Sequence, residues 1–180
     1  MRRLRFLLVA AMAWGLCAGA ASAVDLGAFG SYWKTKDADN AFGAGVKLRL
    51  GIIEFRGSFY NDVTADVDPE ELDFEVSATP LEAGLVLRFL KNAAVSPYVG
   101  GGAGYYMLDT NVGDIDDEAG YYLVGGADIG SGIVAFNVEA MYRNFEGTVV
   151  DQDDSIPELE DEVTLDLSGV AVNAGIIFRF

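Results

Sequence analysis

The chain has no histidine, one cysteine and few basic residues, and each shortage excludes a class of protein. Without histidine, any mechanism that needs imidazole as an acid, a base or a metal ligand is excluded. A single cysteine allows no disulfide framework within the chain. Only 12 Lys and Arg residues stand against 28 Asp and Glu residues, a formal net charge of −16. This balance excludes a basic surface for nucleic acid.

Long apolar runs are also missing after the first 23 residues. A helical membrane protein needs runs of about 18 or more apolar residues. The chain is nevertheless 51% hydrophobic, with 11 Phe, 8 Tyr and 2 Trp residues. A disordered acidic chain is poor in such residues. The 180 residues therefore fit one folded domain that buries a large surface.

Residues 1–23 have the pattern of an export signal. Three arginines within residues 2–5 form a positive segment, and residues 6–16 form an apolar segment too short to span a bilayer. Ala21-Ser22-Ala23 is a cleavage site of the small-x-small type. We predict a signal peptide over 1–23 and a folded domain over 24–180, with an uncleaved anchor as the alternative.

The folded domain has the alternation of apolar and polar residues that is typical of β-strands. We predict eight strands, at 24–34, 41–50, 53–61, 74–90, 95–108, 119–130, 133–146 and 163–180. Their connections alternate between short and long, and most of the acidic residues lie in or beside the long ones, at 35–40, 62–73, 109–118 and 147–162. Short turns at one rim and long loops at the other are typical of bacterial outer-membrane barrels.

The first predicted hairpin separates two faces. A two-residue turn at Gly51-Ile52 makes Arg49 oppose Glu54 on one face and Leu48 oppose Phe55 on the other. The first face mixes glycine with charges of both signs, and the second is wholly apolar.

The hairpin over 120–143 is expected to behave in the same way. A two-residue turn at Ser131-Gly132 pairs Ile129 with Val134 and Tyr121 with Tyr142. Asp128 and Glu139 then lie on the face that mixes glycine with charge, as in the first hairpin.

Three observations place the charged face inside the barrel. The lumen of an eight-stranded barrel is only wide enough for side chains, and glycines among long charged side chains fill such a space. Closure leaves no sheet edge exposed to lipid. Aromatic residues cluster near both rims like interfacial girdles. Phe89, Phe178 and Phe180 lie near the turn rim, and the loop rim has Tyr32, Trp33, Phe59, Tyr60, Tyr105, Tyr106, Tyr121, Tyr122 and Tyr142. A soluble barrel with its apolar face inward is the alternative.

The inward charges are predicted to form a luminal ion-pair network. Its members are Lys47, Arg49, Glu54, Arg56, Glu82, Arg88, Asp128, Glu139 and Arg143. Asp25 and Arg179 are expected to meet at the turn rim, where the last strand closes against the first.

Two segments carry a resemblance to a known family. Residues 96–105, Ser-Pro-Tyr-Val-Gly-Gly-Gly-Ala-Gly-Tyr, are similar to a strand of the small OmpA/OmpX-type outer-membrane barrels of Gram-negative bacteria. The alternation of Ile176, Phe178 and Phe180 resembles the assembly signal of the same class. The resemblance implies an all-β fold: an eight-stranded antiparallel up-and-down transmembrane β-barrel with short periplasmic turns and long acidic extracellular loops.

The resemblance also implies a location and partners. It places the chain in the cell outer membrane as a monomer, in contact with lipid and lipopolysaccharide. The C-terminal strand would be read by the barrel-assembly machinery. Barrel enzymes of this size are implied to use histidine, which this chain lacks, so we predict no enzyme and no cofactor.

The predicted function is a structural or surface-interaction role through the acidic loops, without catalysis. A narrow passive diffusion channel is the alternative. Gly84, Gly100, Gly102 and Gly104 fall on the inward face. They either leave a water-filled channel or make room for arginine and tyrosine side chains, and the narrow lumen favours the second interpretation.

The last long loop contains weak candidates for divalent cations. Asp151, Asp153 and Glu162 have a calcium-loop spacing, but Ile156 stands where such a loop needs glycine. Looser binding by these residues and Asp154, close to lipopolysaccharide phosphates, is the hypothesis that we keep. Its alternative is a solvated, repulsive surface.

Overall fold

The computed structural model describes residues 24–36, 40–64, 75–90, 93–110, 118–149 and 163–180. It contains the strands β1 (Val24–Thr35), β2 (Ala41–Leu50), β3 (Ile53–Thr64), β4 (Glu75–Arg88), β5 (Val95–Thr110), β6 (Glu118–Ile129), β7 (Val134–Asn144), β8 (Glu146–Val149), β9 (Val163–Asp166) and β10 (Gly169–Arg179). Within these residues, no helix has the length and apolar character needed to cross a membrane.

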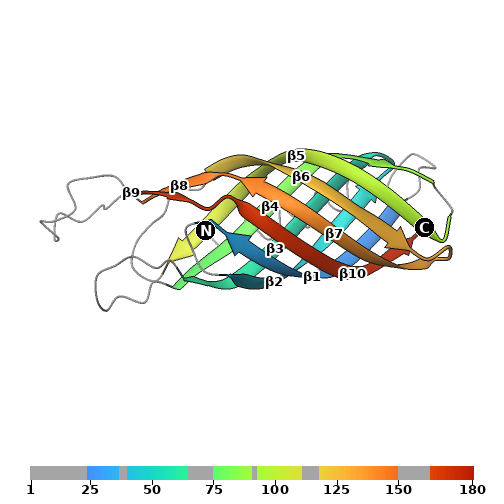
Figure 1. Cartoon of the computed structure of the whole chain (residues 1–180), viewed down its shortest axis with the longest axis horizontal. Coiled ribbons are helices and arrows are strands. Elements are labelled where there is room, and N and C mark those ends of the chain that lie inside the picture. Colours follow the sequence, from blue (N-terminus) through green and yellow to red (C-terminus); the bar gives the residue numbers. More distant parts are fainter. Residues whose placement is uncertain (1–23, 37–39, 65–74, 91–92, 111–117, 150–162) are drawn as a thin grey trace, which may run out of the picture.

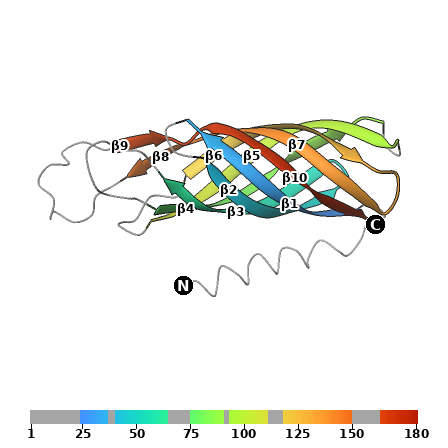
Figure 2. The same cartoon turned by 60° about the horizontal axis from the view of Figure 1, so that its bottom comes forward.

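Eight of the strands close into an antiparallel barrel in the order β1-β10-β7-β6-β5-β4-β3-β2, which confirms the predicted fold class. The strands run obliquely to the long axis of the barrel (Figure 1). The separate hairpin β8–β9 extends beyond one end, which we call the loop end, and the C-terminus lies at the opposite end, the turn end (Figures 1 and 2).

The outer wall of the barrel is apolar. Val46, Leu85, Leu123, Phe136 and Val172 come from different strands, and each is more than half exposed. A continuous wall of this kind far exceeds the apolar patch that a soluble monomer exposes. The alternative of a soluble barrel with its apolar face inward is therefore wrong, and the wall is suited to lipid.

The first hairpin has the predicted register. Arg49 opposes Glu54, and Leu48 opposes Phe55. Gly51 has a φ of 65°, a left-handed conformation that glycine adopts without steric cost. This glycine allows the two-residue turn that fixes the pairing of β2 with β3.

The second hairpin differs from the prediction by two residues. Ile129 opposes Phe136 instead of Val134, and Tyr121 opposes Asn144 instead of Tyr142. The connection is longer because Gly130, with a φ of 135°, turns its N–H away to the carbonyl of Ala94, 2.8 Å distant. A shift of two residues leaves each side chain on its predicted face.

The last predicted strand, 163–180, is divided in two. β9 ends at Asp166 and β10 begins at Gly169. Between them Leu167 is buried, and the Ser168 hydroxyl accepts a hydrogen bond from the N–H of Phe145, at 3.3 Å. Phe145 similarly separates β7 from β8. These inward side chains interrupt both strands at the loop end of the barrel.

Candidate functional site

Glu139 of β7 is the centre of a charged network in the lumen. Its carboxylate accepts hydrogen bonds of 2.8 Å from Lys47 Nζ, Arg56 Nη1 and Asn173 Nδ2. The Tyr98 hydroxyl donates a further bond. These donors come from β2, β3, β10 and β5, so one carboxylate ties together strands from across the barrel.

Glu54 extends the network toward the turn end. It accepts hydrogen bonds from Arg49, its cross-strand partner, and from Arg56 on the same strand. Arg49 Nη1 also lies 3.0 Å from Asp128 Oδ2. Each of these four side chains is at most 4% exposed. Buried charges of this kind are tolerated only when they are paired and hydrogen-bonded.

At the turn end, Asp25 and Arg179 oppose each other across the closure of β1 with β10, as expected. Their ion pairs are made with other residues. Asp25 pairs with Arg88, and Arg179 Nη2 lies 3.5 Å from Asp128 Oδ2. Asp25 and Arg179 are therefore neighbours in the strand register but do not form an ion pair with each other. Each side chain instead pairs with a residue from another strand.

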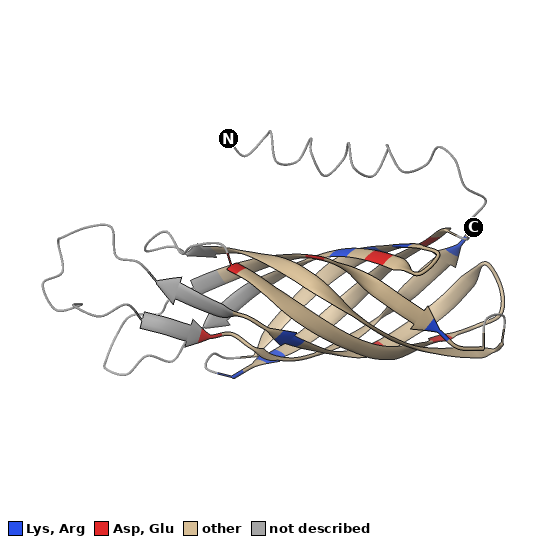
Figure 3. Ribbon diagram, turned by 90° about the horizontal axis from the view of Figure 1, so that it is seen from above, with Lys and Arg blue, Asp and Glu red and all other residues tan. Residues whose placement is uncertain are grey.

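Toward the loop end, Arg143 pairs with Glu82. The Arg143 Nε donates to Glu82 Oε1 at 2.8 Å, and its Nη1 donates to the Tyr60 hydroxyl at 2.8 Å. The Tyr106 hydroxyl donates to Glu82 at 3.2 Å. The structure thus places every member of the predicted luminal set inside the barrel, with Arg88 the most exposed of them at 15%. Figure 3 shows the described Lys and Arg positions in blue and the Asp and Glu positions in red, along strands that are otherwise uncharged.

On the loop-end side of the Arg143–Glu82 pair lies an aromatic layer, which we define as Trp33, Tyr60, Tyr106 and Phe145. The rings of Tyr106 and Phe145 stack at 3.8 Å, and Trp33 lies 5.1 Å from Tyr60 and 5.7 Å from Phe145. Each member is at most 3% exposed. Arg143 lies 5.3 Å from the Trp33 ring, within cation–π range. The layer fills the lumen just inside the loop end.

The predicted aromatic girdle at the loop rim is therefore wrong for four of its nine members. Tyr32, Phe59, Tyr105, Tyr121 and Tyr142 do face outward, and each is more than one third exposed. The inward members are Trp33, Tyr60, Tyr106 and Tyr122. The signal was present in the sequence, because neighbouring aromatics on a strand must point to opposite faces.

Two of the inward glycines, Gly84 and Gly104, make room for tyrosine side chains, and the other two lie close to β4. A Cβ at Gly84 would lie 2.5 Å from the Tyr122 hydroxyl, and one at Gly104 would lie 2.8 Å from the ring of Tyr106. A Cβ at Gly100 would meet Val86 at 2.9 Å, and one at Gly102 would strike the backbone of β4. Of the two interpretations of these glycines, the packing favours filling over a water-filled channel.

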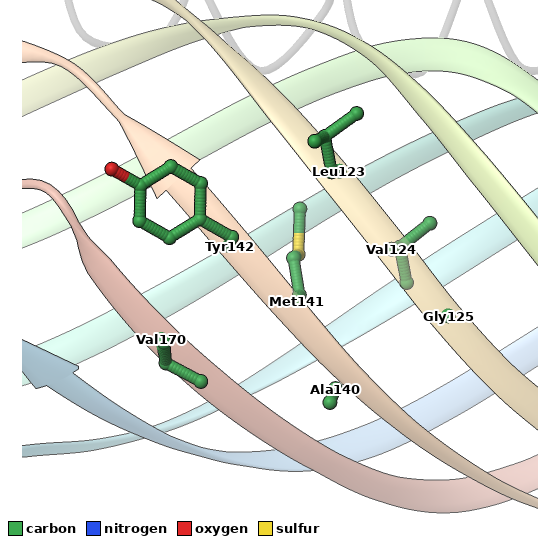
Figure 4. A pocket seen from close by; sticks show the side chains of 7 residues that line it. All are labelled: Leu123, Val124, Gly125, Ala140, Met141, Tyr142 and Val170. Carbon is green, nitrogen blue, oxygen red and sulfur yellow. The ribbon is translucent and has the colours of Figure 1, made fainter.

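A shallow depression of about 240 Å³ lies on the outer wall. Leu123, Gly125, Ala140, Tyr142 and Val170 line it, from β6, β7 and β10 (Figure 4). Small residues at Gly125 and Ala140 leave it open to the outside. It is a feature of the apolar surface, and the Tyr142 hydroxyl is the polar side-chain group among its lining residues.

Asp151, Asp153, Asp154 and Glu162 fall outside the described residues. In the described part of the chain, no group of three or more acidic or cysteine side chains is arranged to hold a metal ion.

The assembly-signal residues Ile176, Phe178 and Phe180 face outward and are 40%, 43% and 75% exposed. Phe178 opposes Leu26 where β10 closes against β1. The backbone N–H of Phe180 donates to the carbonyl of Val24 at 2.8 Å. The three side chains thus form the end of the outer wall at the closing seam.

An ion pair outside the barrel holds the β8–β9 hairpin. Lys36 Nζ donates to Asp166 Oδ2 at 2.6 Å, and the Ser168 N–H donates to Asp166 Oδ1 at 3.0 Å. The hydrogen bond from Lys36, helped by those from Ser168, lowers the pKa of Asp166 to about 2. This contact joins the end of β1 to the base of the hairpin.

Known structures share this architecture. The chain matches OprG from Pseudomonas aeruginosa with a TM-score of 0.65 and 16% identity, over 89% of this chain and 96% of that one. It matches Neisserial surface protein A with a TM-score of 0.57 and 13% identity, over 89% and 98%. It matches the outer membrane protein AlkL with a TM-score of 0.53 and 15% identity, over 91% and 92%.

Searches of protein-family models and of curated proteins find no match to the chain. The three structural neighbours are eight-stranded outer-membrane barrels. At this level of identity the likeness establishes the fold. The chain is an eight-stranded closed antiparallel barrel of the outer-membrane type.

Proposed function

We propose that the chain is a non-enzymatic outer-membrane barrel that acts as a structural or surface-interacting protein. The signal-like residues 1–23 would direct its export, and the apolar wall would lie in the outer membrane. Its acidic loops would face the cell exterior, close to lipopolysaccharide. The C-terminal strand would be recognised by the assembly machinery.

The observation that carries this proposal is the filled lumen. Paired charges occupy its length from Asp25 to Glu82, and the aromatic layer covers them at the loop end. Along this length, the described side chains of the network and the aromatic layer are almost wholly buried against one another. The lumen therefore supports a scaffold for the loops, which are left to make the external contacts.

Planar-bilayer recordings test this proposal against the diffusion channel. We expect no steady conductance from the purified protein, because the luminal side chains are packed and paired. A porin under the same conditions is the positive control for insertion. Steady, reproducible single-channel steps from the wild-type chain would overturn the proposed scaffold function and support a passive diffusion channel.

The aromatic layer offers a matched pair of variants for the same recordings. Trp33→Ala removes an inward ring at 0% exposure, and Tyr121→Ala removes an outward ring at 50% exposure. If the layer helps to close the lumen, brief conductance should rise in the first variant and stay at background in the second. Equal recordings from both variants would assign the closure to the charged network alone.

The surface role needs a separate experiment on the loops. A variant in which Asp151, Asp153 and Asp154 become Asn and Glu162 becomes Gln removes the divalent-cation candidates. We expect weaker calcium-dependent association with lipopolysaccharide vesicles than for the wild type, with unchanged barrel folding. Equal association would remove these carboxylates from the proposed surface.

A further inference from the structure

Five charged side chains converge at the turn end of the lumen, and they do not balance. Asp128 Oδ2 lies 3.0 Å from Arg49 Nη1, 3.5 Å from Arg179 Nη2 and 3.8 Å from Arg88 Nε. Arg88 also pairs with Asp25. Three guanidinium groups therefore surround two carboxylates, which we call the turn-end cluster.

The rest of the network does not supply the missing negative charge. At the loop end Arg143 is matched by Glu82. In the middle, Lys47 and Arg56 are matched by Glu139 and Glu54. Arg49 does reach Glu54, but that carboxylate is already shared with Arg56. Among the luminal side chains that form these ion pairs, one positive charge is thus in excess, and it belongs to the turn-end cluster.

The same cluster contains buried donors without an acceptor. Arg49 Nη2 and both Nε and Nη2 of Arg179 are buried, and none donates a hydrogen bond to an atom of the described residues. Arg49 is 2% exposed. Buried polar groups in folded proteins are nearly always paired, and a guanidinium group only donates. The partner that these nitrogens need is therefore an acceptor.

We propose that the turn end of the lumen binds a small monovalent anion of the halide class, held by Arg49 and Arg179. The excess positive charge favours an anion over a water molecule, because the attraction is strong where solvent is excluded. The packed surroundings restrict the size of the ligand, since the Tyr98 ring lies 4.4 Å from the Arg49 guanidinium carbon.

The cluster is accessible from the turn end. The side chains of Arg88 and Arg179 are 15% and 18% exposed, whereas Asp128 and Arg49 are at most 2% exposed. An anion would thus enter past the two outer arginines and reach the inner one. Arg179 is fixed for this role because its Nη1 donates to the carbonyl of Gly130 at 2.8 Å.

Thermal unfolding in a non-ionic detergent tests the site. Sodium gluconate is replaced by sodium bromide at constant ionic strength, so that screening stays the same while a bulky organic anion gives way to a small monatomic one. We expect a saturable rise in the unfolding temperature with bromide. A rise that is absent, or equal in both salts, would overturn the proposal and leave water as the partner of these nitrogens.

Three variants locate the effect. Arg179→Gln removes the excess charge at the accessible rim and should abolish the bromide response. Asp128→Asn keeps the shape but adds a second excess charge, and should lower the half-saturating bromide concentration roughly tenfold. Lys36→Gln removes one positive charge at the other end of the barrel and should leave the response unchanged. A response that Arg179→Gln retains would also overturn the proposal.

Anomalous diffraction from a bromide-soaked crystal provides a readout that does not depend on stability. The expected peak lies within hydrogen-bond distance of Arg49 Nη2 and Arg179 Nη2. Bromide only at surface lysines, or no bromide in the lumen, would contradict the assignment even if Asp128→Asn failed to fold.

Discussion

The outer wall and the lumen of this barrel are built by the same strands and follow opposite rules. On β4, Leu85 is 54% exposed on an apolar surface, while its neighbour Gly84 faces inward against the Tyr122 hydroxyl. On the outer wall, a side chain needs to be apolar but needs no particular shape, because lipid adapts to large and small apolar side chains alike. Inside, each side chain needs both a particular size and a particular charge partner.

The largest expected effect comes from breaking the lumen at its centre. Glu139→Gln leaves Lys47 and Arg56 under-compensated in a buried site, and we expect a loss of about 3–5 kcal/mol in urea unfolding from lipid vesicles. Glu118→Gln makes the same chemical change at the end of β6, where the residue is partly exposed, and should cost less than about 0.5 kcal/mol. Equal losses of unfolding free energy in the two variants would show that burial of the carboxylate does not determine the destabilisation.

A charge on the outer wall is the corresponding change on the other face. Leu85→Arg should cost roughly 2–4 kcal/mol near the bilayer midplane, whereas Leu85→Val should change little. Gly84→Arg should also destabilise, but through overlap with Tyr122 rather than through contact with lipid. If vesicle unfolding tolerates Leu85→Arg as well as Leu85→Val, the assignment of the two faces fails.

Removal of Phe180 tests the end of the outer wall. Full burial of one aromatic side chain away from water stabilises a fold by about 1.5–3 kcal/mol. A closed barrel can tolerate the loss of that stabilisation. We therefore expect efficient refolding of the truncated chain in detergent but a reduced folded amount in cells, since the assembly signal is lost. Normal outer-membrane levels would contradict this, and failure in both settings would make Phe180 a structural residue.

The smallest effect lies outside both surfaces, at the pair formed by Lys36 and Asp166. The pKa of Asp166 is lowered from 3.8 to about 2, so the contribution of this pair is complete above pH 3.8. It is lost as the pH falls through 2. An exposed pair of this kind contributes less than about 1 kcal/mol.

Nuclear magnetic resonance of the Asp166 carboxyl carbon measures this directly. We expect a titration midpoint near pH 2 in the wild type and a midpoint closer to the ordinary aspartate value in Lys36→Gln. An unchanged midpoint in the variant would assign the shift to the Ser168 hydrogen bonds instead.

The sequence predicts the structure well where the two-residue alternation of a β-strand determines which face a side chain lies on. The eight barrel strands, the inward charges and the pairing of Arg49 with Glu54 all follow from alternation and from one turn glycine. It fails where a connection is anchored to another part of the fold. The bond from Gly130 to Ala94 lengthens the second turn, and no local pattern reveals a partner so distant in the chain.

The candidate site was predictable in membership but not in pairing. The alternation along each strand identifies which charged residues face inward. Which of them form ion pairs depends on which side chains meet across the lumen. Asp25 thus reaches Arg88 and leaves Arg179 to Asp128. The aromatic layer was missed because adjacent aromatics were assigned together to the rim, although alternation sends only one of each neighbouring pair outward.

The break at Phe145 and Leu167 makes the end of the barrel a natural site for exchanging sequence. β7 and β10 pair directly from Arg143 and Gly169 onward, so barrel closure does not rest on β8–β9, which pair separately from Glu146 and Asp166. A foreign peptide grafted between Val149 and Val163 would therefore be displayed on a short stalk, with the barrel below it sealed by its own side chains.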